Sequence, residues 1–248
     1  MLRMLRLISC AVIVPAIVLM SLGGTPDDGF QPIFDGKTLD GWTTFDPSYW
    51  TVQDGAITAT ITADHPLKEN RYLVWKGGEG APGGRLGDFE LKLKSRVRGE
   101  GAINNGFQFR SRVMDNGWDI AGYQVDNNLN VNNVSPWLVR LYDEHGRDTL
   151  ALRGERTTFD ADGKATKEPI AEAAGEPWFK LGEWHEYHLI CVGHRLTLKV
   201  DGRLAAEVID NDPKQFDASG ILGLQLHSGP PTVAQFKDIR LKMLGRAE

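Results

Sequence analysis

Alternation of apolar and charged residues over residues 89–98, which read FELKLKSRVR and break the pattern only at Ser95, is the feature that most constrains the fold of this chain. A period of two is typical of a strand with one face on a core and the other in solvent. The same period recurs over residues 105–112, 122–126, 137–144, 184–208 and 220–227. Outside the N-terminal segment no long amphipathic helix pattern occurs, which argues against α/β nucleotide-binding folds. We therefore predict an all-β protein, a two-sheet antiparallel sandwich of the jelly-roll kind.

Turn signals refine this prediction. Asp54-Gly55 between two short β-like runs predicts a hairpin over residues 50–59. Two-residue turns at 193–194 and 201–202 predict a three-stranded meander over residues 184–208, and the apolar phase changes near Lys237 and Asp238, which predicts a bulge. Residues 153–180 are polar and without a clear period, so we expect a surface excursion with one helical turn near 171–174.

The chain has 248 residues and ordinary globular composition, which suits one β-sandwich domain. Residues 1–23 have a basic start, an apolar stretch and small residues at the end, as a signal peptide does. We expect its removal, with a membrane anchor or lipid attachment at Cys10 as the weaker alternatives. Residues 24–29 then form a short polar lead and residues 30–248 the domain. This predicts export to the periplasm, cell surface or medium, and no membrane span in the mature chain.

Cysteine content argues against a disulfide, and charge argues against nucleic acid as a partner. Cleavage would leave Cys191 as the only cysteine, so no intrachain disulfide is expected, and its apolar surroundings predict a buried, inert thiol. The net charge is −5, with basic and acidic residues intermixed, which disfavours nucleic acid as a partner. The sequence contains no paired glycosidase carboxylates of the form Glu-x-Asp-x-x-Glu, no metal-ligand cluster and no nucleophile elbow.

Polar side chains gather in the central strands and near the end of the chain. Singly, each is more typical of a solvent-facing strand or a turn, but amides, acids, Arg and aromatic rings together suit a hydroxyl-rich ligand in a concave sheet. The set comprises Asn105, Gln108, Arg110, Tyr123, Gln124, Asp126, Tyr142, Asp143, Glu144, Arg147 and His227.

Taken in order, several segments of this chain resemble the 3-keto-disaccharide hydrolase domain family, a group of secreted bacterial domains. The resemblance spans roughly residues 30–244, and it implies a concanavalin-like jelly roll. The resemblance rests on residues 34–42, 50–57, 88–91, 105–111, 122–126, 141–144, 182–185, 220–227 and 236–240.

The resemblance implies cleavage of glycosides whose sugar carries a ketone at C3, made by a separate sugar C3 oxidoreductase. The ketone acidifies the C2 hydrogen, so a base can form an enolate that expels the anomeric group, with later addition of water. Asp126 or Glu144 would be the base, Arg110 and optionally a divalent metal ion would stabilise the enolate, and His227 would assist the leaving group. The oxidised saccharide would be held by Asn105, Gln108, Tyr123, Gln124, Tyr142, Asp143 and Arg147.

Two further hypotheses stay open at this point. A lectin-like module would bind a glycan in the same groove without turnover. A structural or interaction domain would do neither and would instead expose a large apolar patch.

Overall fold

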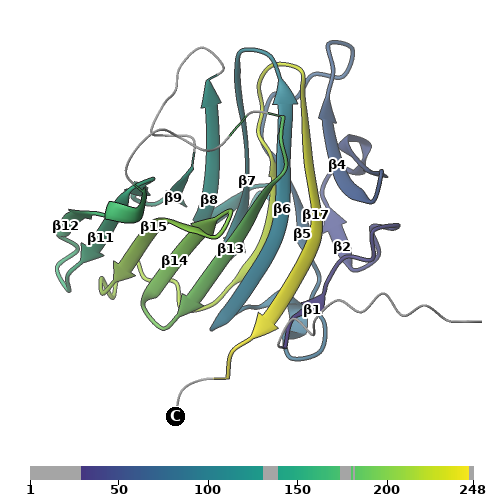
Figure 1. The fold of residues 1–248 in the computed structure, drawn as a ribbon. Helices are drawn as coiled ribbons and strands as arrows, with labels where there is room; N and C mark the ends of the chain where they lie inside the picture. Colours follow the sequence, from purple (N-terminus) through teal and green to yellow (C-terminus); the bar gives the residue numbers. More distant parts are fainter. Residues whose placement is uncertain (1–28, 131–138, 174–179, 181, 246–248) are drawn as a thin grey trace, which may run out of the picture.

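The computed structural model describes residues 29–130, 139–173, 180 and 182–245, and there two β-sheets pack face to face (Figure 1). Their inner faces share one core. Phe89 meets Phe109 across the sheets at 6.4 Å between ring centres, and Phe107 meets Tyr187 at 5.7 Å. The predicted all-β two-sheet sandwich is therefore confirmed. In the described part of the chain, short 3-10 turns interrupt the strands at η1 (Pro47–Tyr49), η2 (Pro82–Gly84) and η4 (Ala171–Ala173).

The first sheet has ten strands, and its neighbours are antiparallel except for the parallel pair β11 and β15. β1 pairs with β17 outside the main path of this sheet. Along the path the order is β12 (Ala165–Pro169), β11 (Glu155–Phe159), β15 (Arg203–Asp210), β14 (Arg195–Val200), β13 (His185–Val192), β6 (Phe89–Gly99), β17 (Thr232–Met243), β4 (Ala56–Ile61) and β3 (Trp50–Gln53), with β1 spanning Gln31–Pro32.

The second sheet has seven strands, all antiparallel to their neighbours, and the polar central strands of the sequence lie here. Its order is β10 (Asp148–Leu152), β9 (Arg140–Glu144), β8 (Ile120–Asn130), β7 (Ala102–Val113), β16 (Ile221–Leu226), β5 (Arg71–Trp75) and β2 (Trp42–Thr44).

Several local predictions are confirmed. β3 and β4 form the predicted hairpin, with Asp54 at φ 52° and Gly55 at φ 73° in the turn. β13, β14 and β15 form the meander. In β17 the pairing register shifts between Lys237 and Arg240, and Asp238 has φ 53°, which is the expected bulge. Cys191 is buried, and burial raises the pKa of its thiol to about 12, so it is inert as predicted.

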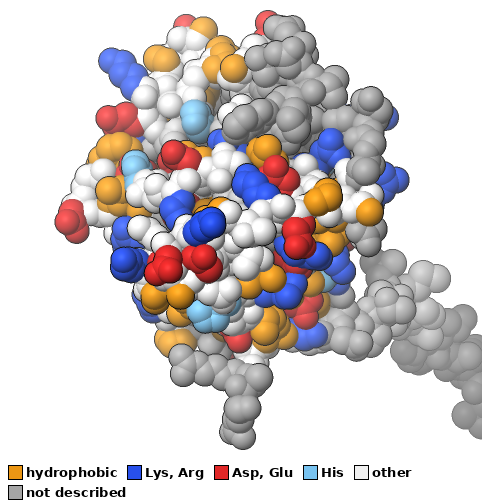
Figure 2. Space-filling model, turned by 90° about the vertical axis from the view of Figure 1, so that its left-hand side faces the viewer, with side chains coloured by type: hydrophobic (Ala, Val, Ile, Leu, Met, Phe, Trp, Pro, Cys, Tyr) orange, Lys and Arg blue, Asp and Glu red, His pale blue; other side chains and the backbone are white. Residues whose placement is uncertain are grey.

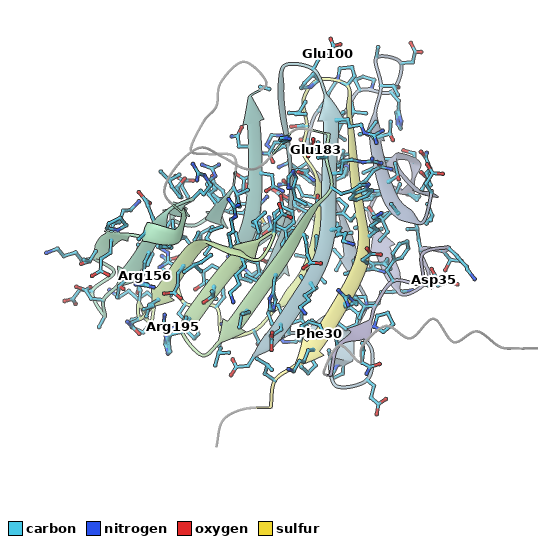
Figure 3. The ribbon with its side chains drawn as sticks, viewed as in Figure 1. Phe30, Asp35, Glu100, Arg156, Glu183 and Arg195 are labelled. Atoms are coloured by element: carbon cyan, nitrogen blue, oxygen red, sulfur yellow. The ribbon has the colours of Figure 1, made fainter. Side chains whose placement is uncertain are left out.

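The expectation of an irregular excursion over residues 153–180 is wrong in its first half. β11 and β12 form a hairpin there, and only η4 is helical. Every residue of the edge strand β12 is exposed, so it carries no apolar alternation that the sequence could show. Arg156 holds β11 against the sheet, because it donates to Glu207 Oε1 of β15 at 2.5 Å, and Arg195 of β14 donates to the same oxygen at 2.7 Å (Figure 3). Residues 174–179 and 181 lie outside the described part.

The predicted signal peptide lies outside the described residues and stays a prediction. Within the described part, no helix is both long and apolar enough to cross a membrane. On the face shown in Figure 2, acidic and basic side chains lie interspersed.

Candidate functional site

The outer face of the seven-stranded sheet carries the candidate site. Its inner face gives Phe107, Val125 and Leu224 to the core, so the alternate residues point away from the other sheet. Strand register then aligns the outward residues in two neighbouring rows across five strands. One row is Arg140, Asp126, Gly106, Gln225 and Tyr72, and the other is Tyr142, Gln124, Gln108, Gly223 and Val74.

Two glutamines are bridged across the centre of this face. Gln124 Nε2 donates to Gln225 Oε1 at 2.8 Å, and Gln225 Nε2 donates to the Tyr72 hydroxyl at 3.3 Å. The bridge passes over Gly106, where an added Cβ would lie 2.8 Å from Gln124 Nε2 and 2.5 Å from the Val125 carbonyl oxygen. A glycine is therefore required at position 106, because the glutamine bridge and the Val125 carbonyl occupy the space that a side chain would need.

Four polar atoms on this part of the sheet are buried without a hydrogen-bond partner among the described residues. They are Asn104 Oδ1, Gln108 Nε2, Gln124 Oε1 and Asp126 Oδ1. A buried polar atom without a partner costs about 1–3 kcal/mol, and folded proteins rarely leave several together. One amide donor beside three oxygen acceptors is the set that a polyhydroxylated ring would satisfy.

Gln108 tests this interpretation, because its Oε1 accepts from Ser111 Oγ at 3.2 Å while its Nε2 has no partner. We expect Gln108→Met to change the free energy of unfolding by less than about 1 kcal/mol, because it removes an unsatisfied donor, and to raise the KM for substrate about 10-fold. Urea unfolding and steady-state kinetics measure the two effects.

The matched control for Gln108 is Gln235 in the other sheet, which is buried and bonded to Arg96 and Thr58. Gln235→Met should lower stability and leave KM unchanged. A Gln108 variant that lost stability with an unchanged KM would show that this amide serves the fold.

Glu144 lies at the end of β9 on the same outer face, opposite Gly122. Burial, and to a smaller extent the charges of Asp126 and Asp119, raise the pKa of Glu144 to about 7, although His145 and Arg140 act in the opposite direction. The Glu144 carboxyl makes no hydrogen bond or ion pair with a described residue. It can therefore exchange a proton near neutral pH.

Two tyrosines surround this carboxyl. Burial is the largest cause that raises the pKa of both Tyr72 and Tyr142, and the charge of Glu144 adds to it in each case. Both phenols thus stay protonated, and the Tyr142 hydroxyl donates to Asp148 Oδ1 at 2.9 Å. Asp126 differs from Glu144, because its Oδ2 accepts from Arg140 Nε at 2.5 Å and the ion pair occupies one of its oxygens.

Several predicted site residues lie instead on the inner face. Asn105 Nδ2 donates to Ser95 Oγ at 2.9 Å between the sheets, and the Tyr123 hydroxyl donates to Asp210. Arg147 binds both Asp143 and Asp210. The alternation of β7, β8 and β9 points Asn105, Tyr123 and Asp143 away from the side that carries Gln108, Gln124 and Glu144, and Arg147 follows in the β9–β10 turn. Asp143 and Glu144 nevertheless line one small pocket at the end of β9.

Arg110 also lies away from the outer face. It has φ 47° at the point where the β7 register shifts, and this bulge turns its side chain into the interior. There it donates to the carbonyls of Gly87 and Gly193, each at 2.8 Å, and pairs with Asp88 at 2.9 Å. Its guanidinium hydrogen bonds with described residues go to these groups, so the structure does not support a role for Arg110 at an enolate.

His227 follows the last residue of β16, one position beyond the pair of Leu226 and Asn105. Alternation places it on the outer face, toward Asn104 and away from Glu144. It is half-buried, and its Nδ1 lies 2.6 Å from the Ser228 carbonyl oxygen. Nδ1 therefore carries the proton, and Nε2 is the nitrogen left for a ligand.

Sequence reasoning missed four residues of this face: Tyr72, Asp119, Arg140 and Gln225. Gln225 interrupts an apolar run in the same period as Gln108 and Gln124, and this signal could have found it. Asp119 lies in the loop before β8, where it bonds His145 Nε2 at 2.8 Å, and no local pattern marks it.

The residues of the site do not form a ligand set for the divalent metal ion that the resemblance implies as an option. Asp126 is paired with Arg140 and Asp119 with His145, and among the described residues no three His, Cys, Asp or Glu side chains converge as a ligand set.

Comparison with known proteins places this chain in a family. The model of the 3-keto-alpha-glucoside-1,2-lyase-like domain matches residues 29–242, and the chain belongs to this family. The predicted resemblance is thereby confirmed. No curated protein matches the sequence.

Solved structures share the fold at low sequence identity. A putative glycosyl hydrolase from Parabacteroides distasonis is 18% identical, with a TM-score of 0.53 over 88% of this chain and 94% of that one. The carbohydrate binding module CBM66 from Bacillus subtilis is 15% identical, with a TM-score of 0.51 over 82% and 95%. A Bacillus subtilis protein with a galectin-like fold is 12% identical, with a TM-score of 0.53 over 84% and 91%. These likenesses show the sandwich fold.

Proposed function

We propose that this protein cleaves the glycosidic bond of 3-keto-glycosides or 3-keto-disaccharides. The observation that carries the proposal is Glu144, a carboxyl with a pKa of about 7 and no bonded partner among the described residues. It shares a face with the unpartnered polar atoms of Gln108, Gln124 and Asp126. Family membership supports the substrate class, since the family is described by a 3-keto-glucoside activity.

The reaction follows from the ketone. The Glu144 carboxylate takes the proton from C2, and the electron pair of the broken C–H bond forms an enolate with the C3 ketone. The enolate then re-forms the carbonyl as the C1–O bond breaks, and the aglycone leaves with a proton. This gives an unsaturated ketone, and addition of water at C1 would complete a hydrolysis. Paired carboxylates, which direct hydrolysis of the acetal needs, are not required.

The other residues of the face would hold the sugar. Gln108 Nε2 donates to a sugar oxygen, while Gln124 Oε1 and Asp126 Oδ1 accept from hydroxyl groups. The role of His227 as the proton donor to the leaving group stays a prediction. The substrate would come from a sugar C3 oxidoreductase, and the N-terminal segment supports an exported location for the reaction.

Incubation of the purified protein with a 3-keto-glucoside tests the proposal directly. We expect release of the aglycone, followed by chromatography, with and without a chelator, and no release from the unoxidised glucoside. Absence of release from the 3-keto-glucoside under both conditions would overturn the proposal.

The pH dependence gives a second prediction. A general base must be deprotonated to act, so kcat/KM should rise with pH and level off above about 7, the pKa of Glu144 in the free protein. Initial rates from pH 5 to 9 measure this limb. If kcat/KM instead rose through a midpoint near pH 4, the base would be a carboxyl of ordinary pKa.

A non-catalytic carbohydrate-binding module is the second candidate, because unpartnered amides buried on a sheet face would serve binding as well as turnover. Saturable binding of an unoxidised glycan, with no release from the 3-keto-glucoside, would favour it. Glu144 distinguishes the candidates, since binding alone gives no use to a carboxyl that ionises near pH 7.

A further inference from the structure

An aromatic cavity adjoins the polar face beside Tyr72. Its volume is about 210 Å³, larger than the cavity of about 150 Å³ that holds benzene in an engineered protein. The cavity lies over β5 and β2 and against the β7–β8 loop. It is lined by Thr43, Thr44, Phe45, Tyr72, Val74, Val113, Gly117, Trp118 and Ile120.

Exposed apolar side chains concentrate at this cavity. Among the described residues, the exposed large hydrophobic side chains are Phe45, Val113 and Val192, and the first two line it. Phe45 is 63% exposed. Clustering of such groups beside a polar site indicates a surface for an apolar ligand.

The rings are held in place. The Arg71 guanidinium carbon lies 5.7 Å from the centre of the Phe45 ring and 5.2 Å from that of Trp118, so one cation contacts both. Asn116 Oδ1 accepts from the backbone amides of Trp118 and Asp119, which fixes the loop. The cavity is therefore pre-formed.

The cavity and the polar face share Tyr72. Its ring lines the cavity, while its hydroxyl accepts from Gln225, the second member of the glutamine bridge. Trp118 lines the cavity and the next residue, Asp119, is one of the charges that act on Glu144. A ligand whose sugar lies over Gly106 can thus extend its leaving group toward Phe45 and Trp118.

The residues that line the cavity indicate the chemistry of the leaving group. The lining contains no charged side chain and no amide, in contrast to the polar face, so the hydroxyls of a second sugar would find few partners. We infer that this cavity binds the aglycone and selects substrates whose leaving group is aromatic, a phenol-type ring.

This inference rests on the proposed function, and the test separates the two. Wild type is compared on 4-nitrophenyl and methyl 3-keto-glucosides with Phe45→Ala, Trp118→Ala and the control Val192→Ala, an exposed hydrophobic residue outside the cavity. We expect the aryl-to-methyl ratio of kcat/KM to fall at least 10-fold in the two cavity variants and to stay unchanged in the control. An unchanged ratio in both cavity variants would overturn the inference while leaving the proposed function intact.

Binding of unoxidised 4-nitrophenyl glucoside, followed by saturation-transfer NMR, needs no turnover. We expect the aryl protons to receive the strongest saturation and to lose it in Trp118→Ala but not in Trp118→Phe or Val192→Ala. Thermal unfolding confirms that each variant is folded. Equal saturation of aryl protons in wild type and Trp118→Ala would overturn the inference, whatever the result of the turnover assay.

Discussion

Glu144→Gln should lower kcat on a 3-keto-glucoside on the order of 10³-fold. The amide keeps the size of the side chain but cannot take the C2 proton. Because Glu144 has no bonded partner among the described residues, the change disrupts no hydrogen bond or ion pair, and KM should change little. Stopped assays of aglycone release measure the effect at pH 8, where wild-type Glu144 is ionised.

The same variant should gain stability at high pH. Folding raises the pKa of Glu144 from an ordinary 4.5 to about 7, so the wild type loses stability as the pH rises through this window. Gln does not ionise, and the partly exposed site reduces the effect, so we expect a gain on the order of 1–3 kcal/mol at pH 8 and none at pH 4.

Glu100→Gln is the matched control, since Glu100 is exposed in the β6–β7 turn (Figure 3). It should change neither activity nor stability. If Glu144→Gln kept more than a tenth of wild-type kcat, Glu144 would not be the base. Asp126, the other carboxyl that the sequence offered, would then be tested in the same way.

The sequence is enough to predict that β7 and β8 have an apolar and a polar face, but not which face each polar residue lies on. In β7 and β8, apolar positions alternate with amides and acids, which is enough to predict strands with a polar face. It is not enough to place Asn105 and Tyr123, which follow the apolar phase and lie between the sheets, bonded to Ser95 and Asp210. A polar residue in the apolar phase can be buried when a partner from the other sheet satisfies it.

The raised pKa of Glu144 depends on contacts that no local pattern shows. Burial of the carboxyl is the largest cause, and it arises only in the folded sheet. The charges of Asp119 from a loop and Asp126 from the neighbouring strand add to it only after β8 and β9 have paired. The sequence could therefore name Glu144 and Asp126 as candidates without choosing between them. The ion pair of Asp126 with Arg140, which the sequence did not predict, is the reason that our proposal takes Glu144 as the base.

Arg110 shows why a prediction based on the two-residue period of a strand fails at a β-bulge. Counting by two from Gln108 places Arg110 on the polar face, but its left-handed backbone turns the side chain inward. Its guanidinium then joins β7 to the segment before β6 and to the β13–β14 turn through Gly87, Asp88 and Gly193. We therefore assign Arg110 to the fold.

Arg110→Met should destabilise the protein by about 3–5 kcal/mol, because it leaves the Asp88 carboxylate and two carbonyls without their buried cation. Thermal and urea unfolding measure the loss. Arg112→Met, two positions along the same strand and exposed, should change stability by less than about 0.5 kcal/mol. Folded Arg110→Met protein should keep most of its kcat at low temperature. A large fall in kcat with wild-type stability would instead show that Arg110 takes part in the reaction. It would also show that the interior contacts of its guanidinium do not stabilise the fold.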